Sequence, residues 1–361
     1  MGTYWVLFAL PAIAALMNET PRTRWLRTPG KGSSLASWLV VVAILTLIIG
    51  LRYEVGGDWF NYFHYLYNVQ GVTPDEVLLM PDPGFQLLNW LSNELDWDVF
   101  GVNLFSGFIF SIGLAVFCRS LPRPWLALAV AVPYLLIVVA MGYSRQGVAL
   151  GLALMGLVAL GKHATGRFVF WVLLAATFHK TAVVLLPLAA LAAARNRWLA
   201  LTWSVASLAL GYWLFLEDSV ERLYVNYVEA EYQSEGALVR LAMNVLPAGL
   251  LLVYRKKFAF APAERNLWLA FAVISLAMFG VLFVSPSSTA VDRIALYMLP
   301  LQLVVFSHFP DVISPPAERD VTVPLLGVVA YYAAVEFVWL NFAGHSFAWV
   351  PYRFYPLEVV F

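Results

Sequence analysis

The sequence predicts an all-α protein that crosses a membrane many times. Of its 361 residues, 61% are hydrophobic and only 12% are charged, which is too little charge for a soluble surface. Apolar runs of about 17–20 residues recur, the helix length that spans a bilayer core of roughly 30 Å. The net charge is zero, so the basic surface typical of nucleic-acid binding is absent. We therefore predict one transmembrane domain over residues 1–361.

The predicted membrane spans follow one another with mostly short connections. They lie at residues 3–17, 35–51, 100–118, 124–142, 145–161, 198–216, 237–254, 266–284, 292–309 and 322–340. The stretch 168–194 is also apolar, but it carries a histidine and a lysine near its middle. With this stretch included, the sequence predicts about 10–12 transmembrane helices.

The distribution of basic residues predicts the orientation, because Lys and Arg mark cytoplasmic loops. One alternating path places 15 of the 22 Lys and Arg residues inside. This path requires both ends of 168–194 to face the cytoplasm, so we predict a re-entrant or short-helix pair there. Both termini are then outside. The outer segments are the loops 52–99 and 217–236 and the tail 341–361.

The predicted outer loop opens with the most polar stretch of the chain, LRYEVGGDWFNYFHYLYN at residues 51–68. Arg52 follows a span on the side that the positive-inside rule disfavours for arginine. Two glycines allow a sharp turn, after which Asp58 is placed to cap a helix. Asn61, Tyr62 and Tyr65 then share one helical face. This pattern fits either an aromatic interfacial helix or a sugar-binding wall.

Three further cationic positions lie at predicted outer depth. Arg145 is the only charged residue between Trp125 and Leu160, and no acidic residue lies within 40 positions of it. An arginine in such a run needs a cavity or an anion, and phosphate is the simplest partner. His179 and Lys180 indicate proton transfer or anion binding at the floor of an outer cavity. Arg293 either pairs locally with Asp292 or completes an arginine cluster.

Metal and cofactor signals are weak. The sequence lacks HExxH, GxSxG and cysteine–histidine metal spacings, and it has no phosphate-binding glycine loop. The DWD at residues 96–98 is too short to predict a metal site. We therefore predict neither a metal nor a cofactor.

Five segments together resemble one known family. RYEVGGDWFNYF, PDPGFQLLNWL, SRQGVALGLAL, FHKTAVVLLPL and DRIALYMLP occur in this order between residue 51 and about residue 300. They resemble the EpsG family of exopolysaccharide proteins, which is related to Wzy-type polysaccharide polymerases. Asp82 stands where the family pattern has glutamate, and a glycine of GGD stands where a small polar residue is expected.

The resemblance implies a GT-C-like glycosyltransferase in the bacterial cytoplasmic (inner) membrane, with its active site facing the periplasm or outside. It would transfer a growing glycan from polyprenyl pyrophosphate onto a lipid-linked repeat unit, without a metal. A direct displacement would invert the anomeric centre. Flippase and chain-length regulator proteins are the partners that the resemblance implies, beside membrane lipid.

The candidate residues fit this chemistry in three groups. Arg52, Arg145, Arg293 and Lys180 would bind the pyrophosphate, because guanidinium groups match phosphate oxygens and stay charged. Asp58 or His179 would accept the proton of the attacking hydroxyl. Asn61, Tyr62, Tyr65 and Asp82 would bind the glycan.

Two alternatives remain open at this point. A glycan ligase would use the same donor and the same arginines. A lipid-linked oligosaccharide flippase or transporter would belong to another class, and paired repeats, which favour a transporter, are absent from the sequence. Deletion separates the classes, because a polymerase mutant accumulates single lipid-linked repeats at the outer face and a flippase mutant retains them inside.

Overall fold

The computed structural model describes residues 1–18, 34–188, 236–314 and 320–358, and the single positions 202, 205, 206 and 209. Within these ranges the regular structure is helical, and the strand pairing is limited to one isolated bridge between Arg52 and Phe354. Most of the predicted span 198–216, nearly all of the loop 217–236 and the last part of 168–194 lie outside the described residues. The all-α class is confirmed for the remainder.

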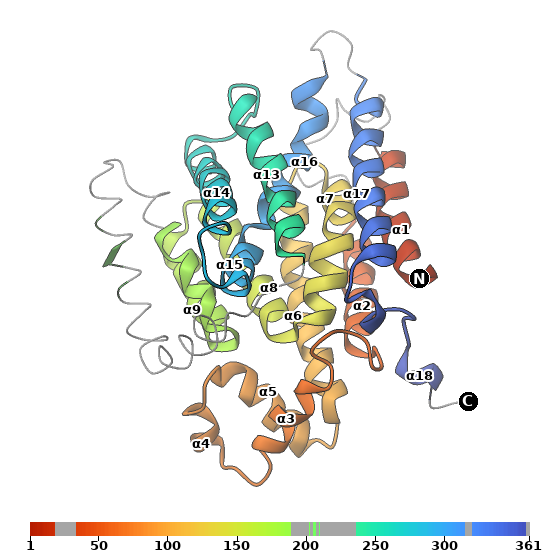
Figure 1. The fold of residues 1–361 in the computed structure, drawn as a ribbon, viewed down its shortest axis with the longest axis vertical. Coiled ribbons are helices and arrows are strands. Elements are labelled where there is room, and N and C mark those ends of the chain that lie inside the picture. Colours follow the sequence, from red (N-terminus) through yellow and green to blue (C-terminus); the bar gives the residue numbers. More distant parts are fainter. Residues whose placement is uncertain are drawn as a thin grey trace.

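The long elements form a bundle of apolar helices (Figure 1). They are α1 (Gly2–Asn18), α2 (Leu35–Gly50), α6 (Asp98–Ser120), α7 (Pro124–Ala131) with its π-helical continuation η2 (Val132–Ala140), α8 (Ser144–Gly161), α9 (Thr165–Phe178), α13 (Ala237–Val253), α14 (Pro262–Val281), α16 (Pro300–Ile313) and α17 (Thr322–Phe342). The short elements are α3 (Asn61–Asn68), α4 (Pro74–Leu78), α5 (Pro83–Glu94), η3 (Lys180–Leu185), α15 (Ser288–Ala295), η6 (Leu296–Met298), η7 (Ser346–Ala348) and α18 (Tyr355–Glu358).

The helices agree closely with the predicted spans. Every predicted span inside the described ranges is helical, and the ends differ by only a few residues. Within the described residues, four helices are long and apolar enough to cross a membrane, namely α6, α8, α14 and α17. The pair Ser288–Met298 and Pro300–Ile313, bent by 44°, makes a fifth, and shorter apolar helices accompany them. The protein is therefore a polytopic all-α membrane protein.

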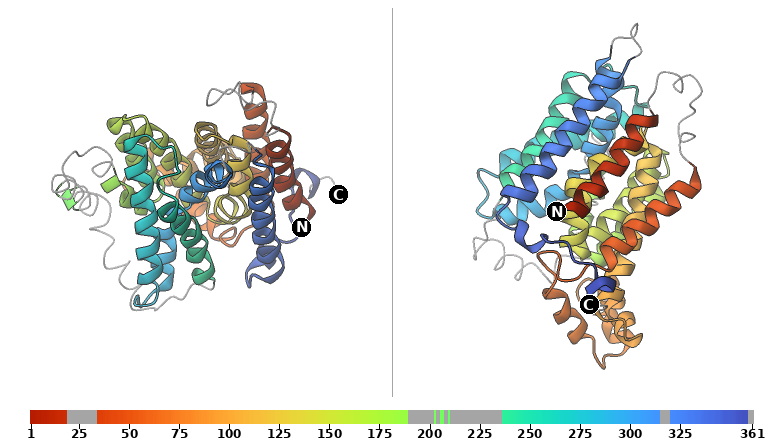
Figure 2. Two further views of the ribbon diagram at one scale, coloured as in Figure 1. Left: turned by 90° about the horizontal axis from the view of Figure 1, so that it is seen from above. Right: turned by 90° about the vertical axis from the view of Figure 1, so that its right-hand side faces the viewer.

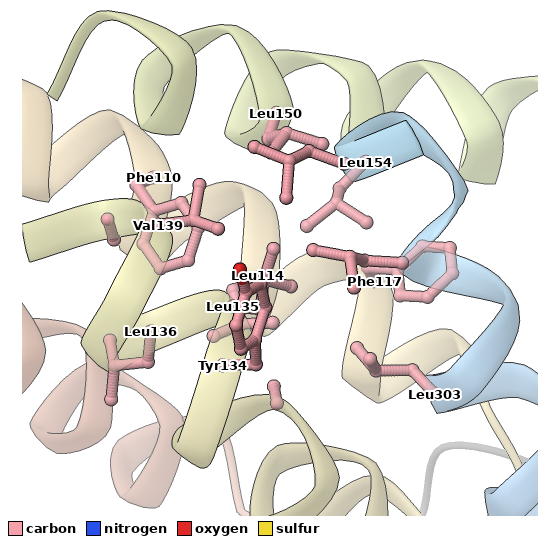
Figure 3. Close-up of a cluster of buried hydrophobic side chains, with 14 of the residues drawn as sticks. Phe110, Leu114, Phe117, Tyr134, Leu135, Leu136, Val139, Leu150, Leu154 and Leu303 are labelled. Atoms are coloured by element: carbon pink, nitrogen blue, oxygen red, sulfur yellow. The ribbon is translucent and has the colours of Figure 1, made fainter. Parts of the chain in front are cut away.

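The centre of the bundle is formed by α6, η2 and α8, and Figure 3 shows their buried side chains meeting those of α16. Leu114, Leu136 and Leu150 are completely buried there. The helices α6 and α8 approach closely because glycines face each other. A Cβ added to Gly151 would lie 2.6 Å from the Cα of Phe110. Small residues allow such close packing where lipid removes the hydrophobic drive between helices.

Residues 52–99 gather at one end of this bundle, where α3, α4 and α5 form a cap below α6 and α8 (Figures 1 and 2). The segment after α17 returns to the same end. There Tyr355 N–H donates to Leu51 O at 2.8 Å, and Gly56 N–H donates to Ala348 O at 2.8 Å. Gly56 has φ +107°, which is why a glycine fits this turn. That this end faces outside stays a prediction.

An ion pair lies at the opposite end of the bundle. Arg123, just before α7, donates to both carboxylate oxygens of Asp311 in α16, at 2.5 and 2.8 Å. The predicted topology places both residues on the cytoplasmic side. The structure is consistent with that pairing of loops, because it brings them to one end of the bundle.

The stretch 168–194 begins with α9 and breaks at His179, as the predicted short-helix pair requires. His179 is extended, with φ −153° and ψ 105°, and the short helix η3 follows. The Lys180 N–H donates to Asp82 Oδ1 at 3.2 Å instead of continuing the helix ladder of α9. The return to the cytoplasmic side lies outside the described residues and remains a prediction.

Candidate active site

Polar side chains from five separate segments meet where the cap joins the bundle. The segments are the turn before α3, the start of α5, the start of α8, the break after α9, and α15. They bring together Asp58, Asp82, Arg145, His179, Lys180 and Arg293, whose charges act on one another. Six of the sequence-predicted site residues therefore share one site.

Arg145 lies at the centre of this site, in the first turn of α8. Its Nη1 donates to Asp82 Oδ2 at 3.0 Å, and its guanidinium lies 4.6 Å from the centre of the Tyr65 ring. The side chain is still 31% exposed, so it can reach a ligand. No acidic residue lies within 40 positions of Arg145 in sequence, but Asp82, 63 positions away, is adjacent to it in the fold.

Asp82 holds Arg145 and the break after α9 in one place. Its second oxygen accepts from the Lys180 N–H, so one carboxylate links α5, α8 and η3. Asp82 has a left-handed backbone with φ +56° and precedes Pro83, a conformation that is strained for a residue before proline. Burial raises the pKa of Asp82, and the charges of Arg145 and Lys180 oppose that rise. Asp82 therefore contributes positioning as well as charge.

Asp58 lies half-buried in the turn that precedes α3. Asn61 Nδ2 donates to its Oδ1 at 3.4 Å. Burial raises the pKa of Asp58 above its usual range, while the nearby charges of Arg293 and Arg145 act in the opposite direction. The helix begins at Asn61 with Phe60 as its N-cap, so the expectation that Asp58 caps it was wrong.

Arg293 comes to the site from α15 and stacks on Tyr143. Its guanidinium lies 4.0 Å from the centre of that ring. The Arg293 carbonyl accepts from Gln146 Nε2 at 2.7 Å, which ties α15 to the first turn of α8. Asp292 accepts two hydrogen bonds from Arg240 at 2.8 and 2.7 Å.

His179 faces a small hydroxyl cluster. Its Nδ1 shares a hydrogen bond of 2.6 Å with Thr181 Oγ1, which also donates to the Tyr297 hydroxyl at 3.4 Å. The charges of Arg145, Arg293 and Lys180 act on the imidazole. Thr181 therefore fixes one ring nitrogen and leaves Nε2 as the other proton acceptor or donor.

Arg52 occupies a different place from the one predicted. It is completely buried, and its Nε donates to Val55 O at 3.0 Å and its Nη1 to Ile49 O. Its Nη2 donates to Asn103 Oδ1 at 2.9 Å and to Ser144 Oγ at 2.8 Å. The structure contradicts a contact of Arg52 with pyrophosphate, because protein oxygens take its donors and its head is shielded from any ligand.

Tyr62 also turns inward. It is 2% exposed, and its hydroxyl accepts from the Ser144 N–H at 2.7 Å. A direct glycan contact of Tyr62 is contradicted by this burial, whereas Asn61 is exposed and Tyr65 is half-buried beneath Arg145. Together Arg52 and Tyr62 hold the first residue of α8, and the next residue is Arg145. They are positioning residues of the site.

Several participants were missed by sequence reasoning. Tyr143, Ser144, Thr181 and Tyr297 are ordinary residues of apolar segments, and only the fold places them here. Arg240 carried a usable signal, because it lies at predicted outer depth against the positive-inside rule. Among the described residues no three His, Cys, Asp or Glu side chains gather as metal ligands.

The fold and the site define the class. This is a polytopic helical membrane protein with a site rich in cations and carboxylates at one end of its bundle. Residues 35–354 match the EpsG family, and the chain belongs to that family, whose members are Wzy-type polymerase-like proteins. Comparisons with curated proteins and with solved structures find no match. The family membership supports a polysaccharide polymerase-like role in the membrane.

Proposed function

We propose that this protein is an inverting, metal-independent polysaccharide polymerase with a GT-C-like fold. It transfers a growing glycan from its polyprenyl pyrophosphate carrier onto a lipid-linked repeat unit at the outer face of the bacterial cytoplasmic membrane. The observation that carries the proposal is the convergence of Arg145, Arg293 and Lys180 with Asp58 and His179 at one end of the bundle. A flippase that supplies the repeat and a chain-length regulator are the expected partners.

The cations bind the pyrophosphate in this proposal. Arg145 uses one nitrogen for Asp82, and its remaining donors are available to a ligand on the exposed side. Arg293 comes to the site from α15, and its guanidinium stacks on the Tyr143 ring. Charge builds on the pyrophosphate oxygen as the glycosidic bond breaks, and preorganised positive charge at that position is a major source of catalysis.

Asp58 is the proposed general base. A hydroxyl oxygen of the acceptor sugar attacks the anomeric carbon of the donor, and the bond from that carbon to the phosphate oxygen breaks. The hydroxyl proton moves to the Asp58 carboxylate, and the bonding electrons leave with the pyrophosphate. A carboxylate with a raised pKa is a better proton acceptor near neutral pH. His179 is the second candidate for this role.

The glycan contacts are proposed at the open edge of the cap. Asn61 is exposed next to Asp58, and Tyr65 offers a ring beside Arg145. An amide binds sugar hydroxyls, and an aromatic face packs against sugar C–H groups. Asp82 acts on the glycan only through the residues it positions.

The experiment that tests the function uses purified protein in proteoliposomes. The substrate is the lipid-linked repeat isolated from a strain in which the gene for this chain is deleted. A polymerase converts it into a ladder of lipid-linked products that differ in mass by one repeat. A flippase moves the repeat between leaflets without changing its mass, and a ligase needs a different acceptor. The absence of a ladder from folded protein would overturn the proposal.

A further inference from the structure

An apolar groove runs between α13 and α17 beside the candidate site. Its volume is about 670 Å³, and its walls are chiefly apolar side chains such as Val239, Met243, Val335 and Val338. Val239 and Val338 are more than half exposed, so the groove opens sideways from the bundle. The helix α16 packs against both α13 and α17 and lies between them (Figure 2).

A second apolar cavity continues the groove toward the opposite end. It has a volume of about 420 Å³ and is lined by α13, α16 and α17, from Leu246 and Phe306 to Val323. Tyr331 lines both cavities, so the two adjoin. Along α17 they extend from Val323 to Phe342, which at 1.5 Å per residue is about 29 Å. That length equals the hydrocarbon thickness of a bilayer, roughly 30 Å.

The groove ends at the cations of the candidate site. Tyr143 lines the groove and carries the guanidinium of Arg293 on its ring. Arg240 also lines the groove and is paired with Asp292, the residue before Arg293. A long apolar chain in the groove therefore has its polar end next to Arg293.

We propose that this groove binds the polyisoprenoid chain of the lipid carrier and delivers its pyrophosphate to Arg293 and Arg145. The inference rests on the proposed function, because it assigns the tail of that substrate. Two observations select the occupant. The positive charge at the polar end matches a pyrophosphate, and the groove together with the second cavity extends about 29 Å along α17, whereas an ordinary phospholipid chain ends at the bilayer midplane.

The groove selects its ligand by shape. A hydrocarbon tail gains little from moving out of lipid into an apolar groove, since both surroundings are equally dry. Affinity for the tail then depends on close packing, which a bulky side chain in the groove disrupts. Ala242 and Ala334 line the groove from α13 and α17 and are exposed, so larger side chains there fill the groove without entering the core.

The test measures binding without glycan transfer. The probe is a photoreactive long-chain polyprenyl pyrophosphate that carries no sugar, compared with a short analogue that ends within one leaflet. The variants are Ala242→Trp and Ala334→Trp. The control is Ala277→Trp, an equally large change at an exposed position of α14 outside the groove. Crosslinked peptides are identified by mass spectrometry, and thermal unfolding in detergent shows that the variants are folded.

The expected result is crosslinking of the long-chain tail to α13 and α17, with affinity about tenfold weaker in both groove variants. The affinity of the control variant for the long-chain probe should be unchanged, and the affinity of the groove variants for the short analogue should also be unchanged. Unchanged long-chain affinity in folded groove variants would overturn the inference. So would equal competition by phosphatidylglycerol vesicles, which would make the groove a general lipid site.

The two proposals can fail separately. If wild-type protein binds the long-chain probe in the groove but forms no glycan ladder, the proposed function fails and the groove assignment stands. If it forms the ladder while the tail crosslinks elsewhere, the groove assignment fails and the proposed function stands.

Discussion

Replacing Arg145 is the sharpest test of the proposed chemistry. Its guanidinium donates to Asp82 at 3.0 Å, lies over the Tyr65 ring and remains 31% exposed. Arg145→Ala removes both the positive charge and the paired N–H donors of the guanidinium. Arg145→Lys keeps the charge but offers a single ammonium, which cannot serve Asp82 and a phosphate with the same geometry.

The expected size of the effect follows from the role of the contact. One charge-assisted hydrogen bond to a group that gains charge in the transition state contributes about 3–4 kcal/mol, or roughly 10²–10³ in rate. We expect a loss of this size for Arg145→Ala. Arg145→Lys should lose at least about tenfold, because it keeps the attraction and loses the bidentate fit.

The assay is the formation of the glycan ladder from purified lipid-linked repeat by membrane-inserted variants. The matched control is Arg265→Ala, an exposed arginine in the first turn of α14 at the opposite end of the bundle. Thermal unfolding separates loss of function from loss of fold, since Asp82 loses a partner in the alanine variant. Near wild-type turnover of folded Arg145→Ala would refute the pyrophosphate contact and leave Arg145 as a tie between α8 and α5.

Five further outcomes are expected. Arg52→Leu should lower the free energy of unfolding by at least about 2 kcal/mol in detergent melts, because it strips buried oxygens of their donors; an unchanged melt would contradict the positioning role. Asp58→Asn should reduce turnover by about 10²–10⁴. Wild-type activity should fall as pH drops through the Asp58 pKa, which burial raises, so the loss begins at higher pH than for an exposed carboxyl; a flat acid limb would exclude Asp58 as base. Cysteines at 163 and 196 should label from the same cytoplasmic side, and labelling from opposite sides would reverse every later loop. Glu336→Met should leave the melt unchanged or raise it, because neither oxygen of this buried carboxylate has a hydrogen-bond partner among the described residues; a clear loss would reveal a partner.

The helices could be predicted from the sequence because their signal is local. Apolar runs of membrane length define α6, α8 and α17 directly. The break after α9 was also visible, as a polar pair inside an apolar run. Its cause was not visible, since the backbone of Lys180 is held by Asp82 across 98 residues of chain.

The sequence could predict which residues gather at the candidate site where burying a charge is costly, but not what role each residue has where its partner determines that role. Arg145 and Arg293 stand out because an arginine at membrane depth needs compensation. The same argument selected Arg52, yet neutral oxygens of Asn103 and Ser144 supply its compensation. Sequence shows that a charge must be satisfied, but only the fold shows whether protein or ligand satisfies it.

The returning segment after α17 sets a condition on the order of assembly. The Tyr352 hydroxyl donates a hydrogen bond to Ile48 O, 304 positions away in sequence. The Tyr4 hydroxyl likewise donates to Trp349 O, 345 positions away. Trp349 also donates to Ile137 O, so the same segment braces the turn that carries Asp58 and the π-helix that leads into α8. Chains enter the membrane in the order in which they are translated. The turn that carries Asp58 therefore gains its final support only after the last helix has been inserted, and a nascent chain that stalls before that point lies in the membrane with an incomplete candidate site.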